Sequence, residues 1–521
     1  MLCRKVVALM LAAFPLAACG SVAASPGNTT QSPAAADTTY YVRPSGNDSA
    51  AGTSPSTAWR TLSRVNSEKL KPGDRVLLQG GQQFSGKLIL TKTDAGDASD
   101  PVVIGSYGSG RASIVTGGNA GILVYDTAGI DVENLIIAST SSPRATGVGI
   151  NVYSDLTNGQ RLTHVTIDDV DVSGFVYGIG IGGATTGFRG VRVENSALHG
   201  NLDDGLVSYA GTFTSADPQY ANEDIYISRV HAYDNPGDPE DKTKNTGNGI
   251  VLGNVKYATI SYSTADDNGG KGAASEGPVG IWAYNSSNVV IDHNLSYGNK
   301  TSNEADGDGF GLDENTTDCS LEYNLSYDNA GAGYLLYSAQ AHSQQKGNVV
   351  RFNVSSRDGQ TSDYYGGITL LGKISDTSIY QNTVVMKARA GTTNPALRLV
   401  GTMSGITVRD NIFATQRGGP IVAASTALAA TAATLRANDY FAASGSWKLA
   451  WGAATYTSLA AWRSATGQEL NGSKATGFDV NPQLAGSVFQ LEVTSADDTR
   501  LGAAFELRST SPLRGAHIGA E

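Results

Sequence analysis

The sequence has few cysteines, few charged residues and only one long apolar run. Three of its 521 residues are cysteine, and charged residues make up 16% of the chain. The formal net charge of -11 argues against a nucleic-acid partner, because such partners are contacted through Lys and Arg side chains. The negative charge also disfavours an acidic glycan, unless a bound cation lies between the two like charges.

The long apolar run lies at the N-terminus and predicts an export signal. Arg4 and Lys5 precede the apolar residues 6–18, which are too few to cross a bilayer as a helix. The run ends in Leu16-Ala17-Ala18-Cys19-Gly20, which resembles the lipobox of bacterial lipoproteins. The resemblance implies that residues 1–19 are a lipoprotein signal peptide and that Cys19 is lipidated. The protein would then be exported and lipid-anchored to the cell envelope, with Gly20 favouring the outer membrane or the cell surface.

The scarcity of cysteine also limits covalent cross-links. Cys3 would be removed with the signal and Cys19 would carry lipid, so Cys319 is the only other cysteine and no disulfide can form within the mature chain. Residues 20–39 are rich in Ala, Ser, Thr and Pro and have no hydrophobic period. This composition predicts a flexible tether between the lipid and the folded part.

Asparagine recurs at a nearly fixed interval in the second half of the chain. Two apolar residues at alternate positions are followed, three residues after the second, by Asn at 294, 324, 353, 382 and 411. Weaker copies of the apolar pattern are centred upstream on Val132, Ile167, Val193, Ile227 and Ile260. Each interval of about 30 residues holds short alternating strands and turns of Gly, Asn and Asp, which is typical of one coil of a solenoid.

These coils predict an all-β fold: a right-handed, single-stranded parallel β-helix of the pectin-lyase-like kind. Coils stacked about 4.8 Å apart would place the Asn residues in a ladder of hydrogen-bonded amides, with Asn324 between Asn294 and Asn353. We expect the β-helix over residues 40–425, with an N-terminal cap helix at 58–65. Residues 426–521 would hold further coils and a capping region with a short helix at 459–463, while helix or degenerate coil stays open for 427–437.

A second strand, which begins with Gly, follows each Asn-bearing strand. The first and third residues after this Gly are mostly apolar and point inward, so the second and fourth residues point outward. Along the stack the fourth position reads Tyr209, Gly253, Tyr284, Asp313, Tyr337 and Leu371. We therefore predict that Asp313 lies between Tyr284 and Tyr337, with Trp282 close by, in a setting where aromatic rings stack on sugar rings.

The loops that enter these strands supply further carboxyl groups. Glu304, Asp306 and Asp308 precede Asp313 and Glu314, and such a cluster is self-repelling unless a cation or shared protons relieve the charge. The run Asp306-Gly307-Asp308-Gly309 partly resembles a calcium-binding loop. We predict Asp313, Asp308 and Glu276 as catalytic residues, Asp306 and Asp308 as candidate calcium ligands, and as sugar-binding residues Trp282, Tyr284, Tyr337 and Tyr209.

Two segments resemble the active-site segments of a family of β-helical pectate lyases. Residues 201–206 read Asn-Leu-Asp-Asp-Gly-Leu and residues 248–253 read Asn-Gly-Ile-Val-Leu-Gly, against N-x-D-D-G-W-D and N-G-F-K-L-G in that family. The resemblance implies that Asp203 and Asp204 bind calcium. However, the family's third Asp is replaced by Val207 and its catalytic Lys by Val251, so a base could come only from loop residues such as Lys242, Lys244 and Lys271.

Three functions stay open from the sequence. The first is a surface-anchored glycoside hydrolase that degrades polysaccharide by Asp/Glu acid–base chemistry. The second is a calcium-dependent, pectate-type polysaccharide lyase with a loop Lys or a His as base, the histidines being His231, His293 and His342. The third is a non-catalytic glycan-binding surface lipoprotein. Residues 40–81 resemble the opening of many secreted β-helix carbohydrate-active proteins, which implies polysaccharide as the partner. We expect the protein to be a monomer.

Overall fold

The computed structural model describes residues 37–118, 120–142, 147–211, 213–361, 363–387, 392–486, 493–498 and 503–520. The predicted signal peptide, the lipidation residue Cys19 and most of the predicted tether lie outside these residues. In the part of the chain that is described, no helix combines the length and the apolar character that a membrane span requires.

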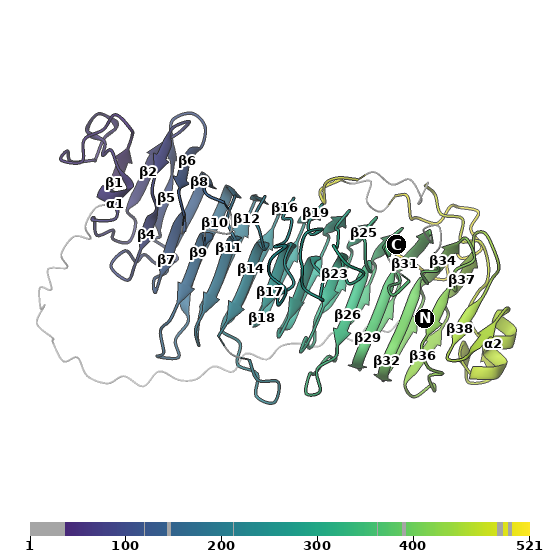
Figure 1. The fold of residues 1–521 in the computed structure, drawn as a ribbon. Coiled ribbons are helices and arrows are strands. Elements are labelled where there is room, and N and C mark those ends of the chain that lie inside the picture. The colour runs from purple at the N-terminus through teal and green to yellow at the C-terminus, as the bar shows by residue number, and fades with distance from the viewer. Residues whose placement is uncertain are drawn as a thin grey trace, which may run out of the picture. The chain divides into compact units, whose positions relative to one another are not determined.

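Residues 37 onward wind into a parallel β-helix whose coils stack strand upon strand (Figure 1). One sheet of the described chain has 14 strands. In chain order these are β4 (Leu88–Leu90), β7 (Ile122–Tyr125), β9 (Val148–Ser154), β11 (Tyr177–Gly183), β14 (Asp204–Ala210), β17 (Asn248–Gly253), β20 (Val279–Tyr284), β23 (Asp308–Leu312), β26 (Tyr334–Ser338), β29 (Ile368–Ser375), β32 (Leu397–Ser404), β35 (Val422–Ala424), β38 (Leu449–Trp451) and β39 (Ala454–Tyr456).

The second sheet has 25 strands within the described residues, in two strips that share β8 and β10. The first strip is β1 (Thr39–Val42), β2 (Arg75–Gln79), β5 (Val102–Tyr107), β8 (Ile130–Ser139), β10 (Leu162–Ser173), β12 (Phe188–Glu194), β15 (Asn222–Ser228), β18 (Val255–Ser261), β21 (Ser287–Asp292), β24 (Ser320–Glu322), β27 (Val349–Arg351), β30 (Ser378–Tyr380), β33 (Ile406–Arg409) and β36 (Ala433–Arg436). The second adds β3 (Gln83–Ser85), β6 (Ala112–Thr116), β13 (Ala197–His199), β16 (His231–Tyr233), β19 (Thr264–Asp266), β22 (Leu295–Tyr297), β25 (Leu325–Tyr327), β28 (Val354–Ser356), β31 (Thr383–Lys387), β34 (Ile412–Gln416) and β37 (Asp439–Ala442).

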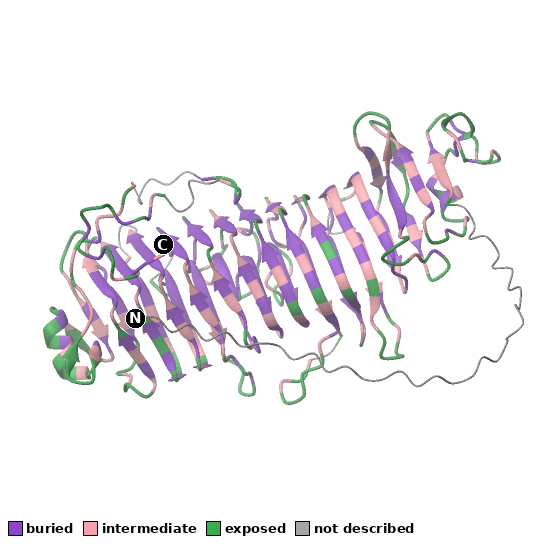
Figure 2. Ribbon diagram, turned by 180° about the vertical axis from the view of Figure 1, so that it is seen from behind, coloured by how far each residue is buried: buried purple, intermediate pink, exposed green. Residues whose placement is uncertain are grey.

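The strand register confirms the predicted repeat. The apolar residues that centre the copies pair with one another from coil to coil, without a slip, from Val132 to Val408. All of them are fully buried. Buried and partly exposed residues alternate along many of the strands (Figure 2). One inward face of every coil therefore builds a continuous core, as the period of two requires.

The predicted asparagine ladder is present inside the stack. Each side-chain Nδ2 donates to the Oδ1 of the next residue at 2.8–3.1 Å, through Asn294, Asn324, Asn353, Asn382, Asn411 and Asn438. The last amide donates to the buried carboxylate of Glu469 at 3.0 Å. Each amide thus finds a partner in the coil that follows, which removes the cost of burying it.

A second ladder, which the sequence analysis did not predict, runs through Asn201, Asn235, Asn268, Asn299 and Asn329 with Nδ2–Oδ1 distances of 2.9–3.2 Å. It ends on Asp358, which accepts from Asn329 at 2.9 Å. Burial raises the pKa of Asp358 to about 7. Its spacing shrinks from coil to coil as the loops shorten, which concealed the period in the sequence.

The two ends of the stack are closed by short helical elements. At the N-terminal end, η1 (Pro55–Thr57) precedes α1 (Leu62–Val65), so the predicted cap helix is only one turn long. Residues 58–61 are not helical, because Trp59 pairs with Val42 and stacks on Tyr40 at 4.6 Å. At the other end, α2 (Leu459–Thr466) confirms the predicted short helix and packs Trp462 against Trp451.

The region after residue 425 continues the coils. Strand β36 lies within residues 427–437, which resolves the open alternative in favour of a degenerate coil. A small hairpin, β40 (Leu470–Asn471) and β41 (Lys474–Ala475), follows α2. The C-terminal segment then packs Val493, Ala496 and Phe505 against a satellite core that includes Tyr327.

Candidate active site

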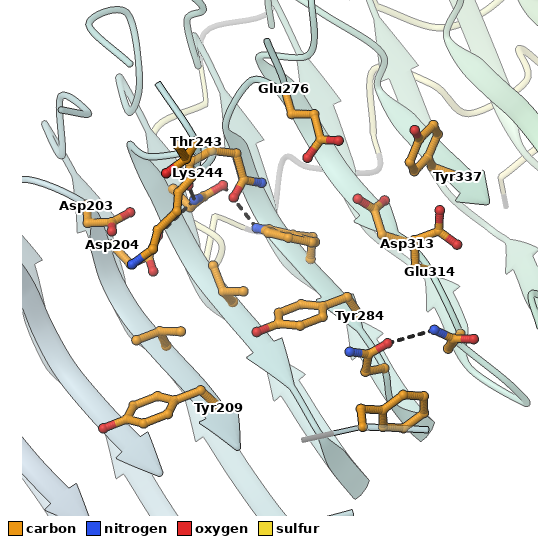
Figure 3. Close-up of a pocket in the computed structure, with 18 of the residues that line it drawn as sticks. Asp203, Asp204, Tyr209, Thr243, Lys244, Glu276, Tyr284, Asp313, Glu314 and Tyr337 are labelled. Atoms are coloured by element: carbon orange, nitrogen blue, oxygen red, sulfur yellow. Dashed lines mark hydrogen bonds between the residues drawn. The ribbon is translucent and has the colours of Figure 1, made fainter. Parts of the chain in front are cut away.

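The outward residues of the 14-stranded sheet lie in the predicted order. Tyr284 pairs with Gly253 and Tyr337 with Leu371. Leu312 pairs with Ala283 on one side and Leu336 on the other, which places the next residue, Asp313, between Tyr284 and Tyr337 (Figure 3). The order that alternation predicted for this face is therefore confirmed by the register.

A cleft of about 850 Å³ runs across these coils, and it is lined by residues from β9 to β26 and their loops. Its polar side chains gather in two groups, which we name by their central residues. The Asp313 end contains Glu276, Asp313 and Glu314, and the Lys244 end contains Tyr177, Asp203, Asp204 and Lys244. The four aromatic residues predicted to bind sugar also line the cleft: Tyr209, Trp282, Tyr284 and Tyr337.

Asp313 is held by its backbone while part of its side chain has no partner. It follows β23 directly, its amide donates to the Ala283 carbonyl at 2.8 Å, and its own carbonyl accepts from the Thr316 hydroxyl at 2.8 Å. Its Oδ1 is buried and finds no hydrogen-bond partner in the described part of the chain. Burial, and then the neighbouring carboxyl groups of Asp306, Glu314 and Glu276, raise the pKa of Asp313 well above its ordinary value.

Glu314 is a cleft residue to which the sequence analysis gave no role. It is buried, and its Oε1 accepts from the backbone amides of Ala339 at 2.7 Å and Gln340 at 2.9 Å. Its Oε2 is buried and unpartnered among the residues that the structure describes. Glu314 therefore presents a rigid acceptor beside Asp313. The hydrogen bonds that fix it come from the following coil, and no local sequence signal indicates them.

Asp308 does not reach the cleft, which corrects its prediction as a catalytic residue. Its side chain is fully buried, and Oδ1 accepts from the Ala332 amide of the next coil. Burial and the adjacent Asp306 raise the pKa of Asp308 well above its ordinary value, which disfavours the charged form of this buried acid.

Asp306 is also absent from the lining of the cleft. Its Oδ1 accepts from the Tyr365 hydroxyl and its Oδ2 from the Gly277 amide, both at 2.7 Å. Burial raises the pKa of Asp306 to about 6. Because Gly277 is the neighbour of Glu276, Asp306 positions the segment that carries a cleft carboxylate.

Trp282 lies in the wall of the cleft and is not an exposed platform. Its ring is 6% exposed and packs with Val207 and Val251, the positions where the pectate lyase family has Asp and Lys. The indole Nε1 donates to Asn248 Oδ1 at 3.1 Å, and Asn248 Nδ2 donates to Asp204 Oδ1 at 2.8 Å. Apolar side chains thus replace the Asp and the catalytic Lys of the pectate lyase family at this place.

Of the loop bases proposed from the sequence, only Lys244 lines the cleft. Lys242, Lys271 and His342 are absent from the lining, and the other two histidines pair with carboxylates elsewhere: His231 with Asp266 at 2.6 Å and His293 with Asp292 at 2.9 Å. The described residues contain no group of three His, Cys, Asp or Glu side chains placed to hold a metal ion. Calcium binding by Asp203 and Asp204, or by Asp306 and Asp308, stays a prediction.

Comparison with known proteins shows a right-handed parallel β-helix, as predicted. The family model described as the right handed beta helix region matches residues 158–384. The structure is similar to that of GH136 lacto-N-biosidase from Eubacterium ramulus, with a TM-score of 0.53, 19% identity, and coverage of 69% of this chain and 65% of that chain. The structure of XylC with xylose gives a TM-score of 0.50 at 10% identity, covering 86% of this chain and 87% of that one. Likenesses at these identities show the fold.

A protein that is similar to this chain in sequence is also a lacto-N-biosidase. The chain is 26% identical, over 489 aligned residues, to a lacto-N-biosidase of Bifidobacterium longum subsp. longum. The alignment covers 72% of this chain but only 29% of that protein, so the chain spans less than a third of the relative's length.

Proposed function

We propose that this protein is a glycoside hydrolase whose active site is the Asp313 end of the cleft. The observation that carries the proposal is that a half-buried Asp313, whose Oδ1 has no partner among the described residues, lines the same cleft as Glu276 (Figure 3). Asp313 interacts electrostatically with Glu276, and this is one cause of its raised pKa. Two carboxyl groups with different environments are what glycoside hydrolysis requires.

In this proposal Asp313 keeps its proton near neutral pH and donates it to the oxygen of the scissile glycosidic bond. Glu276 acts from the opposite side, either as the nucleophile or as the base that activates water, and the separation of the two groups decides which. Tyr284 and Tyr337 flank Asp313 and would hold the sugar rings by stacking. The resemblance to lacto-N-biosidases supports a glycosidase and makes glycans that contain lacto-N-biose the first substrates to test.

The test is product analysis with the purified protein on neutral and acidic glycans, including a chromogenic lacto-N-bioside. We expect new reducing ends without an unsaturated, ultraviolet-absorbing product. Each reaction is run with added calcium and with a chelator, which separately tests the predicted calcium ligands. An unsaturated product would contradict the hydrolase and indicate a lyase. Binding without any product would contradict it and indicate a non-catalytic glycan-binding protein.

One observation favours the lyase as a second candidate. Lys244 reaches the cleft beside Asp203 and Asp204, and a lysine in that setting could remove a proton from a sugar ring. Against this, the acidic residues at both ends of the cleft would repel a uronate unless calcium is bound. The product panel decides between the two reactions.

We further propose that the protein is lipid-anchored to the cell envelope through Cys19. We expect Cys19→Ala to move the protein from the membrane fraction to the soluble fraction of the expressing cells, because the lipid would be lost. The measurement is immunodetection in both fractions, with Cys319→Ala as the matched control that keeps the lipidation residue. Equal membrane association of the Cys19→Ala protein would contradict the anchor.

A further inference from the structure

The Lys244 end of the cleft is built from buried polar groups that the proposed chemistry does not use. Asp203 and Asp204 are 6% and 5% exposed, yet both line the cleft. Asp204 is held by Asn248, which also accepts from Trp282, so a hydrogen-bonded chain runs from Asp204 to the wall of the cleft. The Tyr177 hydroxyl lies within hydrogen-bonding reach of Asp203.

Lys244 extends from its loop toward Asp203 and Asp204 (Figure 3). Its positive charge interacts electrostatically with both acids, and it lowers the pKa that each would otherwise have. The Lys244 end thus offers one donor, the Lys244 ammonium group, beside two acceptors, the Asp203 carboxyl group and the Tyr177 hydroxyl oxygen, whose proton is donated to Asp203. An exposed donor beside buried acceptors suits the vicinal hydroxyl groups of a sugar ring.

The two ends are separated both along the stack and along the strand direction. Asp204 begins β14 and Asp313 follows β23, and the register carries one strand to the other through β17 and β20. Three steps of about 4.8 Å separate the two strands by about 14 Å along the stack, and because Ser208 is level with Leu312, Asp313 lies five residues, about 16 Å, further along the strand direction than Asp204. Tyr284 lies on the same face between the two ends, whereas Tyr209 lies further along the strand that Asp204 begins; both line the cleft (Figure 3). A glycan that reaches from one end to the other must therefore have several rings, and its path passes Tyr284.

We propose that the Lys244 end is a second sugar-binding site, which holds a neutral ring of the same glycan at a distance from the scissile bond at Asp313. The protein would then recognise an oligosaccharide of several rings, and a disaccharide would fill only the Asp313 end. This inference rests on the proposed hydrolase function, because that function fixes where the scissile bond lies.

Charge selects a neutral ring at this site. Burial and the neighbouring Asp203 raise the pKa of Asp204 well above its ordinary value, which disfavours its charged form. The pKa of Asp203 is raised to about 6 by burial, so its negative charge opposes the positive charge of Lys244. The nearby Asp238 and Asp241 add further negative charge. The attraction between Lys244 and an anionic sugar would be cancelled by repulsion from these acids.

The test measures binding directly, by isothermal titration of the Asp313→Asn protein with lacto-N-tetraose, a neutral tetrasaccharide, and with the disaccharide lacto-N-biose. We expect the tetrasaccharide to bind about tenfold more tightly or better, because hydrogen bonds to charged groups contribute at its far ring. Adding Lys244→Met or Tyr177→Phe should remove most of that excess. Lys242→Met, an exposed neighbour outside the cleft lining, is the matched control and should keep it.

The outcomes separate this inference from the proposed function. Equal affinities for the two sugars, or an excess that Lys244→Met and Tyr177→Phe leave unchanged, would overturn the second site even where the unmodified protein hydrolyses the tetrasaccharide. Absence of binding by either sugar, with no hydrolysis by the unmodified protein, would overturn both proposals for this glycan. Mass spectrometry of the recovered ligand verifies that the tetrasaccharide stays intact during titration.

Discussion

Replacing Asp313 with Asn is expected to reduce turnover by a factor of about 10²–10⁴, the usual effect of removing a general acid. The change preserves the shape of the side chain and all of the backbone hydrogen bonds that hold residue 313. Its Oδ1 is buried without a partner among the described residues, so the carboxyl group contributes little to folding. Replacing a buried acid that is surrounded by other acids should leave the melting temperature unchanged or slightly raised.

The measurement is kcat on the best substrate of the product panel, together with thermal unfolding. Asp318→Asn is the matched control, because Asp318 is exposed on the same coil and does not line this cleft. The control should retain full turnover. If the Asp313→Asn protein also kept full turnover, Asp313 would not be the general acid. Asp203 and Asp204 would then be the next candidates for that role.

Replacing Asn324 with Ala is expected to lower the free energy of unfolding by an amount near the upper end of about 1–3 kcal/mol, the cost of leaving buried polar groups unpaired. Asn324 donates to the Ile291 carbonyl at 2.8 Å and to Asn353 at 3.1 Å. Its Oδ1 accepts from both the backbone and the side chain of Asn294, each at 3.0 Å. Alanine would leave donors and acceptors in two neighbouring coils without partners and without access to water.

Denaturant or thermal unfolding measures this effect. Asn47→Ala is the control, because the Asn47 side chain is exposed and accepts only from the nearby Ser49 amide. That substitution should change the stability by about 0.5 kcal/mol or less. A loss of stability for Asn324→Ala as small as that of Asn47→Ala would contradict the view that the ladder stabilises the stack.

The fold could be predicted because its coils require apolar and Asn residues at regular intervals of the sequence. A coil must bury one face of each strand and must satisfy each buried Asn through its neighbours, so Ile291, Leu321 and the Asn residues that follow them recur at an almost constant interval. The same alternation predicted which residues face outward, and it placed Asp313 correctly between Tyr284 and Tyr337.

Features that depend on contacts between coils could not be predicted. Whether Asp308 faces the cleft depends on the Ala332 amide, 24 residues away, which binds its carboxyl group. Glu314 becomes a fixed acceptor because of amides in the following coil. Lys244 reaches the cleft because of the path of a long loop, and neither period nor spacing encodes that path.

The central claim is that the Asp313 end hydrolyses a glycosidic bond, and hydrolysis in ¹⁸O-labelled water tests it most directly. The purified protein is incubated with lacto-N-tetraose in labelled water, and the released sugars are analysed by mass spectrometry before the label exchanges. Our account predicts one ¹⁸O atom in the new reducing end, at a rate that Asp313→Asn lowers by a factor of about 10² or more. Cleavage without incorporation of the label, or labelled product at an undiminished rate from the Asp313→Asn protein, would contradict it.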